Sequence, residues 1–328
     1  MSKVKSSPMY LQAYRAGTLE DIIRELKKHL KGCKLCPIEC GINRDEKQGA
    51  CGVGKKTKLT NAILHFGEEP PVSGSEGAGA VFFSGCSMRC IYCQNMGFSQ
   101  KGIGVEMSVD DLSFIFLELQ KAGAKTLDLV TPTPHLPFIM EALEKSIPKG
   151  LNLPLVYNTS GYEKAETLKL LRGIVDIYLV DIRYTDDEMG MKYSKVPDYW
   201  SVTQKALKEM FDQVGPFDGS KMKGMIIRLL VLPNDVSGTL KALDFIAKDL
   251  SKSIPIAIMS QYIPLFEARR DPLISRKITR EEYERVLDYA DRLGFENGWY
   301  QTDKVERVSA KAVPSIYKFL NSLLKPSR

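Results

Sequence analysis

The chain has 328 residues, 44% of them hydrophobic and 26% charged, a composition typical of an ordinary globular protein with room for a large core. Its net charge of +6 comes from Lys and Arg residues spread along the chain, which disfavours a dedicated nucleic-acid partner without excluding one. No apolar run is long enough to span a bilayer, and residues 1–17 lack the apolar core of a signal peptide, so we expect a cytoplasmic protein with no membrane partner.

Short apolar runs alternate with amphipathic stretches along most of the chain. An N-capped helix is predicted over residues 18–30, ahead of a cysteine-rich segment. Beyond it, strands are predicted over residues 79–85, 126–130, 154–158, 175–182, 225–232 and 254–262, and helices over 108–122, 135–147, 163–171, 198–214, 237–250, 281–293 and 309–323. Strands that alternate with helices form parallel sheets. We therefore predict an α/β fold, an open or partial (β/α)6 barrel followed by C-terminal helices.

This pattern divides the chain into three parts. Residues 1–75 are predicted to hold the first helix and a small cysteine-knot metal-binding segment, residues 76–295 the barrel, and residues 296–328 a helical tail. All seven cysteines lie between Cys33 and Cys93. In a chain expected to be cytoplasmic, such clustering favours metal binding over disulfide bonds.

Four of these cysteines form an N-terminal set. Cys33 and Cys36 lie on one tight turn, Cys40 follows, and Cys51 lies in the glycine-rich residues 49–54, where another sulfur can approach the backbone closely. Four thiolates make a closed shell that suits zinc, a mononuclear iron or a second four-iron cluster, and the spacing does not choose among them. Because no ligand position stays open, we expect a structural or electron-relay site.

The other three cysteines lie in Gly85-Cys86-Ser87-Met88-Arg89-Cys90-Ile91-Tyr92-Cys93, directly after the first predicted barrel strand. We call residues 85–93 the three-cysteine loop. Its thiolates can bind three irons of a four-iron cluster, which usually takes four thiolates. The fourth iron would then stay open to a small molecule, like the open position of a catalytic zinc site. The alternative is a structural zinc loop that takes its fourth ligand from elsewhere.

Polar side chains follow the ends of the predicted barrel strands, where barrels of parallel strands gather their functional groups. They are, in chain order, Thr131, Thr133, Asn158, Ser160, Asp181, Arg183, Arg228 and Gln261. Helix capping or turn formation would explain Ser160 alone, but together these residues would ring the mouth beside the three-cysteine loop. Such a ring suits a zwitterionic ligand with a ribose, and the two arginines are candidates for binding its carboxylate or a substrate acid.

Two histidine regions allow more than one interpretation. His135 lies near a predicted helix start, where a structural role is more common than general acid–base catalysis. Glu68 and Glu69, just after His65, are equally compatible with lining the edge of a cluster and with capping a turn.

Several segments together resemble one family. They are Cys33-x2-Cys36-Pro37-x2-Cys40, His65-Phe66-Gly67-Glu68-Glu69-Pro70-Pro71, the three-cysteine loop with Gln94-Asn95, Val130-Thr131-Pro132-Thr133, Tyr157-Asn158-Thr159-Ser160-Gly161-Tyr162 and Ile258-Met259-Ser260-Gln261-Tyr262. A Cys-x3-Cys-x2-Cys run after a strand, with an aromatic residue before the last cysteine, resembles the signature of the radical S-adenosylmethionine (SAM) superfamily. Within it, residues 30–295 resemble the proteins related to pyruvate formate-lyase-activating enzyme.

The resemblance implies an oxidoreductase in which a [4Fe-4S] cluster and SAM generate a 5′-deoxyadenosyl radical that abstracts hydrogen from a substrate. The implied cluster ligands, which are also the catalytic centre, are Cys86, Cys90 and Cys93. Tyr92 would lie beside the adenine, Asn158 and Ser160 near the ribose, and Arg228 near the methionyl end of SAM. The implied substrate is a protein glycine, and the implied partner is a low-potential electron donor such as ferredoxin or flavodoxin.

Three departures from that family leave the substrate open. Activating enzymes usually carry Gly-Gly-Glu where this chain has Thr131-Pro132-Thr133, and Asp-x-Lys where it has Asp181-Ile182-Arg183. Their auxiliary cysteines often follow the three-cysteine loop, whereas here the additional four precede it. Modification of RNA, a peptide or a small metabolite is therefore an alternative. A non-catalytic iron–sulfur electron carrier is an alternative of another class, but a carrier needs no open iron.

Overall fold

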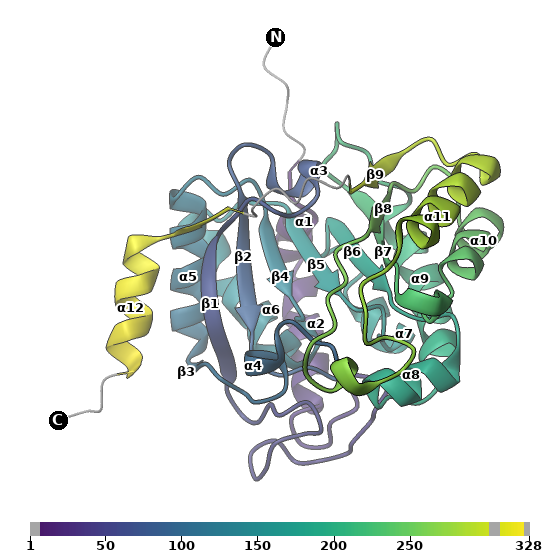
Figure 1. The fold of residues 1–328 in the computed structure, drawn as a ribbon. Helices are drawn as coiled ribbons and strands as arrows, with labels where there is room; N and C mark the ends of the chain where they lie inside the picture. Colours follow the sequence, from purple (N-terminus) through teal and green to yellow (C-terminus); the bar gives the residue numbers. More distant parts are fainter. Residues whose placement is uncertain (1–6, 302–308, 325–328) are drawn as a thin grey trace.

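One curved sheet organises residues 7–301 and 309–324, which are the residues described by the computed structural model. Its strands are β1 (Thr57–His65), β2 (Ala78–Phe83), β3 (Val105–Met107), β4 (Leu127–Val130), β5 (Leu155–Thr159), β6 (Ile177–Ile182), β7 (Gly224–Leu230), β8 (Ile256–Met259), β9 (Gly298–Tyr300) and β10 (Ala310–Ala312). Their order is β10-β1-β2-β4-β5-β6-β7-β8-β9, with β3 beside β1 (Figure 1). Within the described residues no pairing joins β9 to β10, so the sheet is open.

The strands from β2 to β9 in that order run parallel. Six of them, β2 and β4 to β8, correspond to the strands predicted from the apolar runs, so the predicted α/β fold with a partial parallel barrel is confirmed. The sequence-based prediction lacks β9 and also β1, β3 and β10, which pair antiparallel at one edge. Along β1 buried residues alternate with more exposed ones, as expected for a strand with one solvated side.

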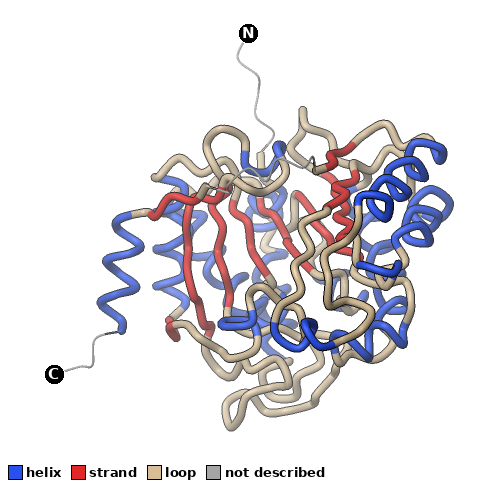
Figure 2. The backbone as a smooth tube through the Cα atoms, viewed as in Figure 1, coloured by secondary structure: helices blue, strands red, loops and turns tan. Residues whose placement is uncertain are grey.

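Most of the helices cover the outer side of the sheet (Figure 2). The helices are α1 (Met9–Arg15), α2 (Thr18–Lys28), α3 (Pro70–Ser73), α4 (Met96–Ser99), α5 (Val109–Lys121), α6 (Leu136–Ser146), α7 (Ala165–Leu170), α8 (Asp187–Ser194), α9 (Tyr199–Val214), α10 (Thr239–Asp249), α11 (Arg280–Leu293) and α12 (Pro314–Leu324), with 3-10 turns at Thr133–His135, Ile147–Lys149, Pro233–Asp235 and Phe266–Arg270. Helices α3 and α4 lie at the ends of the sheet and α12 lies beside its edge (Figures 1 and 2). The predicted side-chain cap of α2 is not formed, because the Thr18 hydroxyl donates back to the Ala13 carbonyl at 3.1 Å. Helices α1, α3, α4 and α8 were not predicted from the sequence.

The C-terminal part differs from the predicted tail at one point. The helix predicted over residues 309–323 is preceded by β10, which pairs with β1, and Pro314 then starts α12. Residues 302–308 and 325–328 of the predicted tail lie outside the described residues. The domain boundaries at 75 and 295 stay predictions, and the sheet continues past both through β1 and β9. None of the described helices is long and apolar enough to cross a membrane.

The two faces of the parallel sheet differ in chemistry, because neighbouring residues of a strand point to opposite faces. The outer face, which includes Tyr157 and Ile227, belongs to the large apolar core under the helices. The inner face carries a small apolar cluster at the strand starts, including Val156 and Leu179. Towards the strand ends the inner face becomes polar and charged, and this is the edge from which the three-cysteine loop leaves β2.

Candidate functional site

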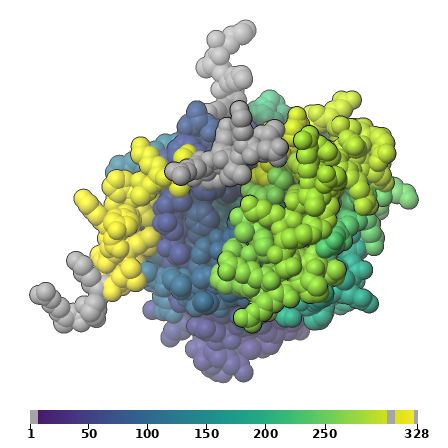
Figure 3. Space-filling view, in the orientation of Figure 1, coloured from purple at the N-terminus to yellow at the C-terminus, as the bar shows by residue number. Residues whose placement is uncertain are grey.

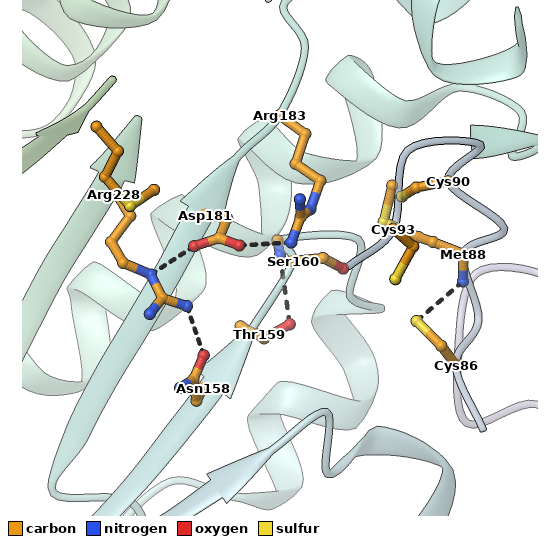
Figure 4. A network of polar contacts seen from close by, with 12 residues as sticks. Cys86, Met88, Cys90, Cys93, Asn158, Thr159, Ser160, Asp181, Arg183 and Arg228 are labelled. Carbon is orange, nitrogen blue, oxygen red and sulfur yellow. Dashed lines mark hydrogen bonds and ion pairs between the residues drawn. The ribbon is translucent and has the colours of Figure 1, made fainter. Parts of the chain in front are cut away.

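The three-cysteine loop leaves the carboxyl end of β2 through a left-handed residue, Gly85 (φ +95°). The loop then turns back so that its cysteines lie on one side, beside Ser160 and Arg183 from the ends of neighbouring strands (Figure 4). All three thiols are free. The loop therefore gathers three sulfur donors at the edge of the sheet where the inner face is most polar.

Each of the three sulfurs has a hydrogen-bonding neighbour. The pairs are the Met88 amide and Cys86 Sγ at 3.4 Å, the Ser194 hydroxyl and Cys90 Sγ at 3.0 Å, and the Ser99 hydroxyl and Cys93 Sγ at 3.3 Å. Donors of this kind stabilise thiolates and tune the potential of a bound cluster. The donor set thus fits a sulfur-ligated centre.

Burial determines the acidity of two of these thiols. It raises the pKa of Cys86 to about 12, and the nearby Cys90 adds to the rise. Burial also raises the pKa of Cys90, although the Arg183 guanidinium and the Ser194 hydroxyl favour its thiolate. In the metal-free protein Cys86 and Cys90 are therefore neutral thiols at pH 7, and iron would displace their protons as it binds.

Within residues 7–301 and 309–324, no three His, Cys, Asp or Glu side chains form a ready-made site for a single metal ion. A four-iron cluster makes a different demand, because it places each thiolate on a separate iron. Three free thiols on one short loop, each beside an N–H or O–H group, are compatible with that demand.

A chain of hydroxyl groups connects Tyr92 to Cys90. The Tyr92 hydroxyl lies 2.6 Å from the Tyr184 hydroxyl, which lies 2.8 Å from Ser194 Oγ, the donor to the Cys90 sulfur. Tyr92 is 4% exposed, and its ring meets Tyr262 edge to face. Tyr92 therefore anchors the loop, and its role beside an adenine stays a prediction.

Asp181 is the centre of a charged network on the inner face. Its Oδ1 accepts a hydrogen bond from Arg228 Nε at 2.5 Å, and its Oδ2 accepts one from Arg183 at 2.6 Å. Arg228 also donates to Asn158 Oδ1 at 2.6 Å. Because β5, β6 and β7 are parallel neighbours, these four predicted site residues meet although they are distant in sequence (Figure 4).

Three further carboxyl groups lie close to this network: Glu68, Glu69 and Asp128. Glu68 Oε2 lies 3.1 Å from Arg228 Nη1. Burial raises the pKa of Glu69 to about 7 and also raises the pKa of Asp128, which the negative charge of Glu68 raises further. Both glutamates follow β1 and so lie near the start of β2, away from the three-cysteine loop, and Glu69 makes no side-chain cap. Glu69 therefore does not cap the turn through its side chain, and the alternative, a place at the edge of a cluster, stays a prediction.

Several buried polar atoms of this region have no hydrogen-bond partner among the described residues. They are Asp128 Oδ1, Glu69 Oε2 and Arg183 Nε, whereas His65 Nδ1 lies 3.5 Å from Glu68 Oε1. Buried polar atoms are normally paired, so atoms of both charge signs without partners fit a ligand that carries both donors and acceptors. A zwitterion such as the methionyl end of SAM is such a ligand.

The remaining predicted residues of the mouth lie at the rim or outside the network. Thr131 has a left-handed backbone (φ +59°), and its amide donates to the Asn158 carbonyl. The Ser160 carbonyl accepts a hydrogen bond from Tyr199. Gln261 is exposed beyond β8, where it accepts a hydrogen bond from Gln301 at 2.9 Å. Their roles in binding a cofactor stay predictions.

Thr133 belongs to a buried cluster around Glu163, which the sequence reasoning missed. Thr133 and Thr159 donate to Glu163 Oε1 at 2.6 and 2.5 Å, and the Tyr157 hydroxyl lies 3.5 Å from Oε2. Burial raises the pKa of Glu163 to about 7, although the hydrogen bonds from these three hydroxyl groups act to lower it. This cluster ties the ends of β4 and β5 together, and the polar run from Thr159 to Glu163 was its only local signal.

His135 is a structural residue. It is fully buried, its Nε2 donates to the Ser84 carbonyl at 2.8 Å, and its Nδ1 lies 3.0 Å from the Thr57 hydroxyl. Its ring stacks on Phe83 with 4.8 Å between centroids. His135 therefore holds the end of β2, just before the three-cysteine loop, against β1 and α6.

The stability of the fold should depend on pH through His135. Burial lowers its pKa from 6.5 to about 3, so below pH 6.5 the unfolded chain binds a proton that the folded chain excludes. The free energy of unfolding should therefore fall by about 2 kcal/mol between pH 7 and pH 5 on this account alone. Urea unfolding of the wild type and of His135→Gln at both pH values measures this, and equal pH slopes in the two proteins would refute it.

The four N-terminal cysteines lie in residues 29–56, which contain no helix or strand. Cys33, Cys36 and Cys51 are buried and Cys40 is partly exposed. The backbone of this segment touches the three-cysteine loop, because the Cys86 amide donates to the Cys51 carbonyl at 3.2 Å. The second metal site itself stays a prediction.

Comparison with known proteins gives a consistent result. A family model described as the Radical SAM superfamily matches residues 80–217. The uncharacterized protein MJ0674 of Methanocaldococcus jannaschii is 31% identical over 289 residues, which cover 85% of this chain and 80% of that protein. MJ1227 of the same organism, whose name refers to glycyl-radical enzyme activation, is 26% identical over 112 residues, 33% of this chain and 44% of that protein. A crystal structure of a domain of pyruvate-formate lyase-activating enzyme from Bacteroides vulgatus has a TM-score of 0.38 at 14% identity, covering 51% of this chain and 92% of that one.

Proposed function

Because this chain belongs to the radical SAM superfamily, we propose that it binds a [4Fe-4S] cluster through Cys86, Cys90 and Cys93 and cleaves SAM reductively to start hydrogen abstraction. The observation that carries the proposal is the position of three free thiols on one loop, at the edge of the sheet where Arg183, Asp181 and Arg228 form a charged network. Three ligands for four irons leave one iron for SAM.

When bound, the cluster and SAM supply a 5′-deoxyadenosyl radical, and the chain contributes binding, orientation and exclusion of water. Arg228 and Arg183 would bind the carboxylate of SAM, since guanidinium groups pair with carboxylates in a fixed geometry. Both arginines now pair with Asp181, whose carboxylate could then turn to the amino group of SAM. Asn158, Ser160 and the Thr131 backbone would line the ribose, and burial of the network would keep water from the radical.

A protein glycine is the substrate that we propose first. It is supported by the partial similarity to MJ1227, whose name refers to glycyl-radical enzyme activation. The three departures from the activating-enzyme pattern described above make RNA, a small metabolite or another peptide site the alternative. The partner in either case would be a low-potential electron donor of the ferredoxin or flavodoxin class.

The proposal predicts that anaerobically reconstituted protein converts SAM into methionine and 5′-deoxyadenosine when dithionite is added. The matched control is the variant in which Cys86, Cys90 and Cys93 are all Ala, treated identically. Chromatography of both reactions measures the product. Reconstituted wild-type protein that carries iron and sulfide but forms no more 5′-deoxyadenosine than the triple variant would contradict the proposal.

The substrate class can be tested with deuterium. A radical that takes hydrogen from a glycine α-carbon should carry deuterium into 5′-deoxyadenosine when total protein from cells grown on α-deuterated glycine is the substrate. Total RNA from cells grown on deuterated nucleosides serves as the parallel sample. Mass spectrometry of 5′-deoxyadenosine decides between them, and label from RNA alone would reject the protein substrate.

A further inference from the structure

Residues 29–56 form a long stretch of irregular backbone between α2 and β1. Segments of this length without helix or strand are uncommon in compact domains and usually have a function. Its internal backbone hydrogen bonds are those of turns and loops, such as those from the Cys33 amide to the Ile42 carbonyl and from the Gly49 amide to the Val53 carbonyl. A cross-link would add to these bonds and hold the segment in one shape.

The segment carries four thiols, and two of them, Cys40 and Cys51, meet at one turn. Cys40 Sγ and Cys51 Sγ are 3.4 and 3.5 Å from the point that a Cβ on Gly49 would occupy, so both sulfurs lie at this turn. Cys33, Cys36 and Cys51 are buried, and Cys40 is partly exposed. None of the four forms a disulfide. The cross-link that fits four free thiols in one segment is a metal centre. Because the described residues hold no ready-made site for a single metal ion, the metal would draw these thiols into their final geometry as it binds.

The segment rests directly on the three-cysteine loop. The Cys86 amide donates to the Cys51 carbonyl, so one hydrogen bond joins a residue of each cysteine set. Arg89 donates to the Ala50 carbonyl at 2.9 Å. A Cβ on Gly85 would lie only 2.6 Å from the Cys51 carbonyl oxygen, so the glycine permits this close approach. The two cysteine sets are thus held at a short separation through their own backbones.

Other contacts fix the segment across the strand ends. Arg44 is 2% exposed and donates to the Pro134 carbonyl at 2.5 Å. The Thr167 hydroxyl donates to the Leu35 carbonyl at 2.9 Å, and Lys164 pairs with Glu39. The segment therefore keeps its position relative to the loops after β4 and β5 as well as to the three-cysteine loop.

The opposite side of the segment faces the surface. It forms the purple lower part of the molecule in Figures 1 and 3. Cys40 is the partly exposed member of the set. The segment has more exposed lysines than exposed acids: the lysines are Lys31, Lys34, Lys47, Lys55 and Lys56, and the acids are Glu39, Asp45 and Glu46. An acidic protein could dock here and be steered by charge.

We propose that Cys33, Cys36, Cys40 and Cys51 hold an iron-containing redox centre that relays single electrons from an acidic ferredoxin- or flavodoxin-class donor to the cluster of the three-cysteine loop. The proposal rests on the proposed function. In the first step the donor is oxidised and the centre is reduced by one electron. In the second step the centre passes that electron to the cluster of the three-cysteine loop and returns to its oxidised state. No atom or proton is transferred. Zinc has no redox chemistry and would serve only to fold the segment.

The identity of the centre is tested in the variant with Cys86, Cys90 and Cys93 replaced by Ala, which leaves only the N-terminal set. Anaerobic reconstitution should load this variant with iron, and dithionite should change its electron paramagnetic resonance spectrum. Removing Cys40 as well should abolish both results. A preparation that binds zinc alone, or no metal, would overturn the proposal whether or not the full chain cleaves SAM.

The relay is tested in the full chain with Cys40→Ala. SAM cleavage driven by reduced flavodoxin should be lost, whereas cleavage driven by dithionite, a small reductant that can reach the three-cysteine loop directly, should persist. Equal rates with both reductants in variant and wild type would overturn the relay. If neither protein forms 5′-deoxyadenosine with dithionite, the proposed function fails instead.

A spectroscopic measurement covers the case in which Cys40→Ala does not fold. In the fully reduced wild type the two centres should broaden each other's resonances, because the two cysteine sets touch. The wild-type spectrum is compared with the sum of two spectra, that of the triple variant and that of a cluster without broadening. If the two agree, the centres are not coupled, and the relay is overturned.

Discussion

Replacing Cys90 by Ala is expected to abolish SAM cleavage and to remove most of the iron bound at the three-cysteine loop. Cys90 is the middle ligand and is 7% exposed, so little water reaches the position of its sulfur. One iron of the cluster would lose its only protein ligand, and clusters of this type are normally held by thiolates at each protein-bound iron. Iron and sulfide analysis, together with the 5′-deoxyadenosine assay under dithionite, measures both losses.

Ser194→Ala is the matched control for Cys90→Ala. It removes the hydroxyl that donates to Cys90 Sγ at 3.0 Å but leaves all three thiols in place. The iron content should therefore stay at the wild-type value, while the reduction potential should fall, because hydrogen bonds to the sulfurs help to set cluster potentials. If Cys90→Ala retained iron and activity, the three-cysteine loop could not be the catalytic centre. If Ser194→Ala lost the iron, the loss in Cys90→Ala would reflect a damaged loop rather than a missing ligand.

The fold could be predicted where the sequence signal is local. The buried strands β2 and β4 to β8 are short apolar runs between amphipathic stretches. Strands of parallel sheets are covered on both faces, so they appear in the sequence as nearly continuous apolar runs. The antiparallel edge was missed because its signals are weak: β3 and β10 have three residues each, and the alternating β1 lies outside the βα rhythm. Pairing between β1 and β10 also joins residues almost 250 positions apart, from Ile63 to Ala312, which no local pattern reveals.

In the candidate site, too, the residues with a local sequence signal could be predicted and the contacts between distant segments could not. Asn158, Asp181, Arg183 and Arg228 could be anticipated because each lies at or near the end of a predicted parallel strand, and such ends share one edge. Glu68 reaches Arg228 from the connection between β1 and β2, which depends on the unpredicted β1. The sequence likewise gave no indication that residues 29–56 would touch the three-cysteine loop, since that contact is made by the backbone of Cys51 and Cys86.

Gly85→Ala should strongly destabilise the junction between the two cysteine sets. Gly85 has φ +95°, where an L-residue costs about 1–2 kcal/mol. Its added Cβ would also lie 2.6 Å from both the Cys51 carbonyl oxygen and Val53 Cγ2, and such overpacking adds about 1–3 kcal/mol. The total loss in the free energy of unfolding should therefore be about 2–5 kcal/mol, measured by urea unfolding of the metal-free protein.

Gly123→Ala separates the two causes, because Gly123 has a similar φ of +88° but open space around its Cβ position. It should lose only the backbone cost of about 1–2 kcal/mol and keep wild-type iron content. The excess loss in Gly85→Ala is then the cost of pushing the N-terminal segment away from the three-cysteine loop. If both variants lose the same free energy of unfolding, the N-terminal segment moves away from the added Cβ at little cost. A segment that moves so readily could not hold two metal centres at a fixed separation. The same pair of variants thus tests the contact on which electron transfer between the two cysteine sets depends.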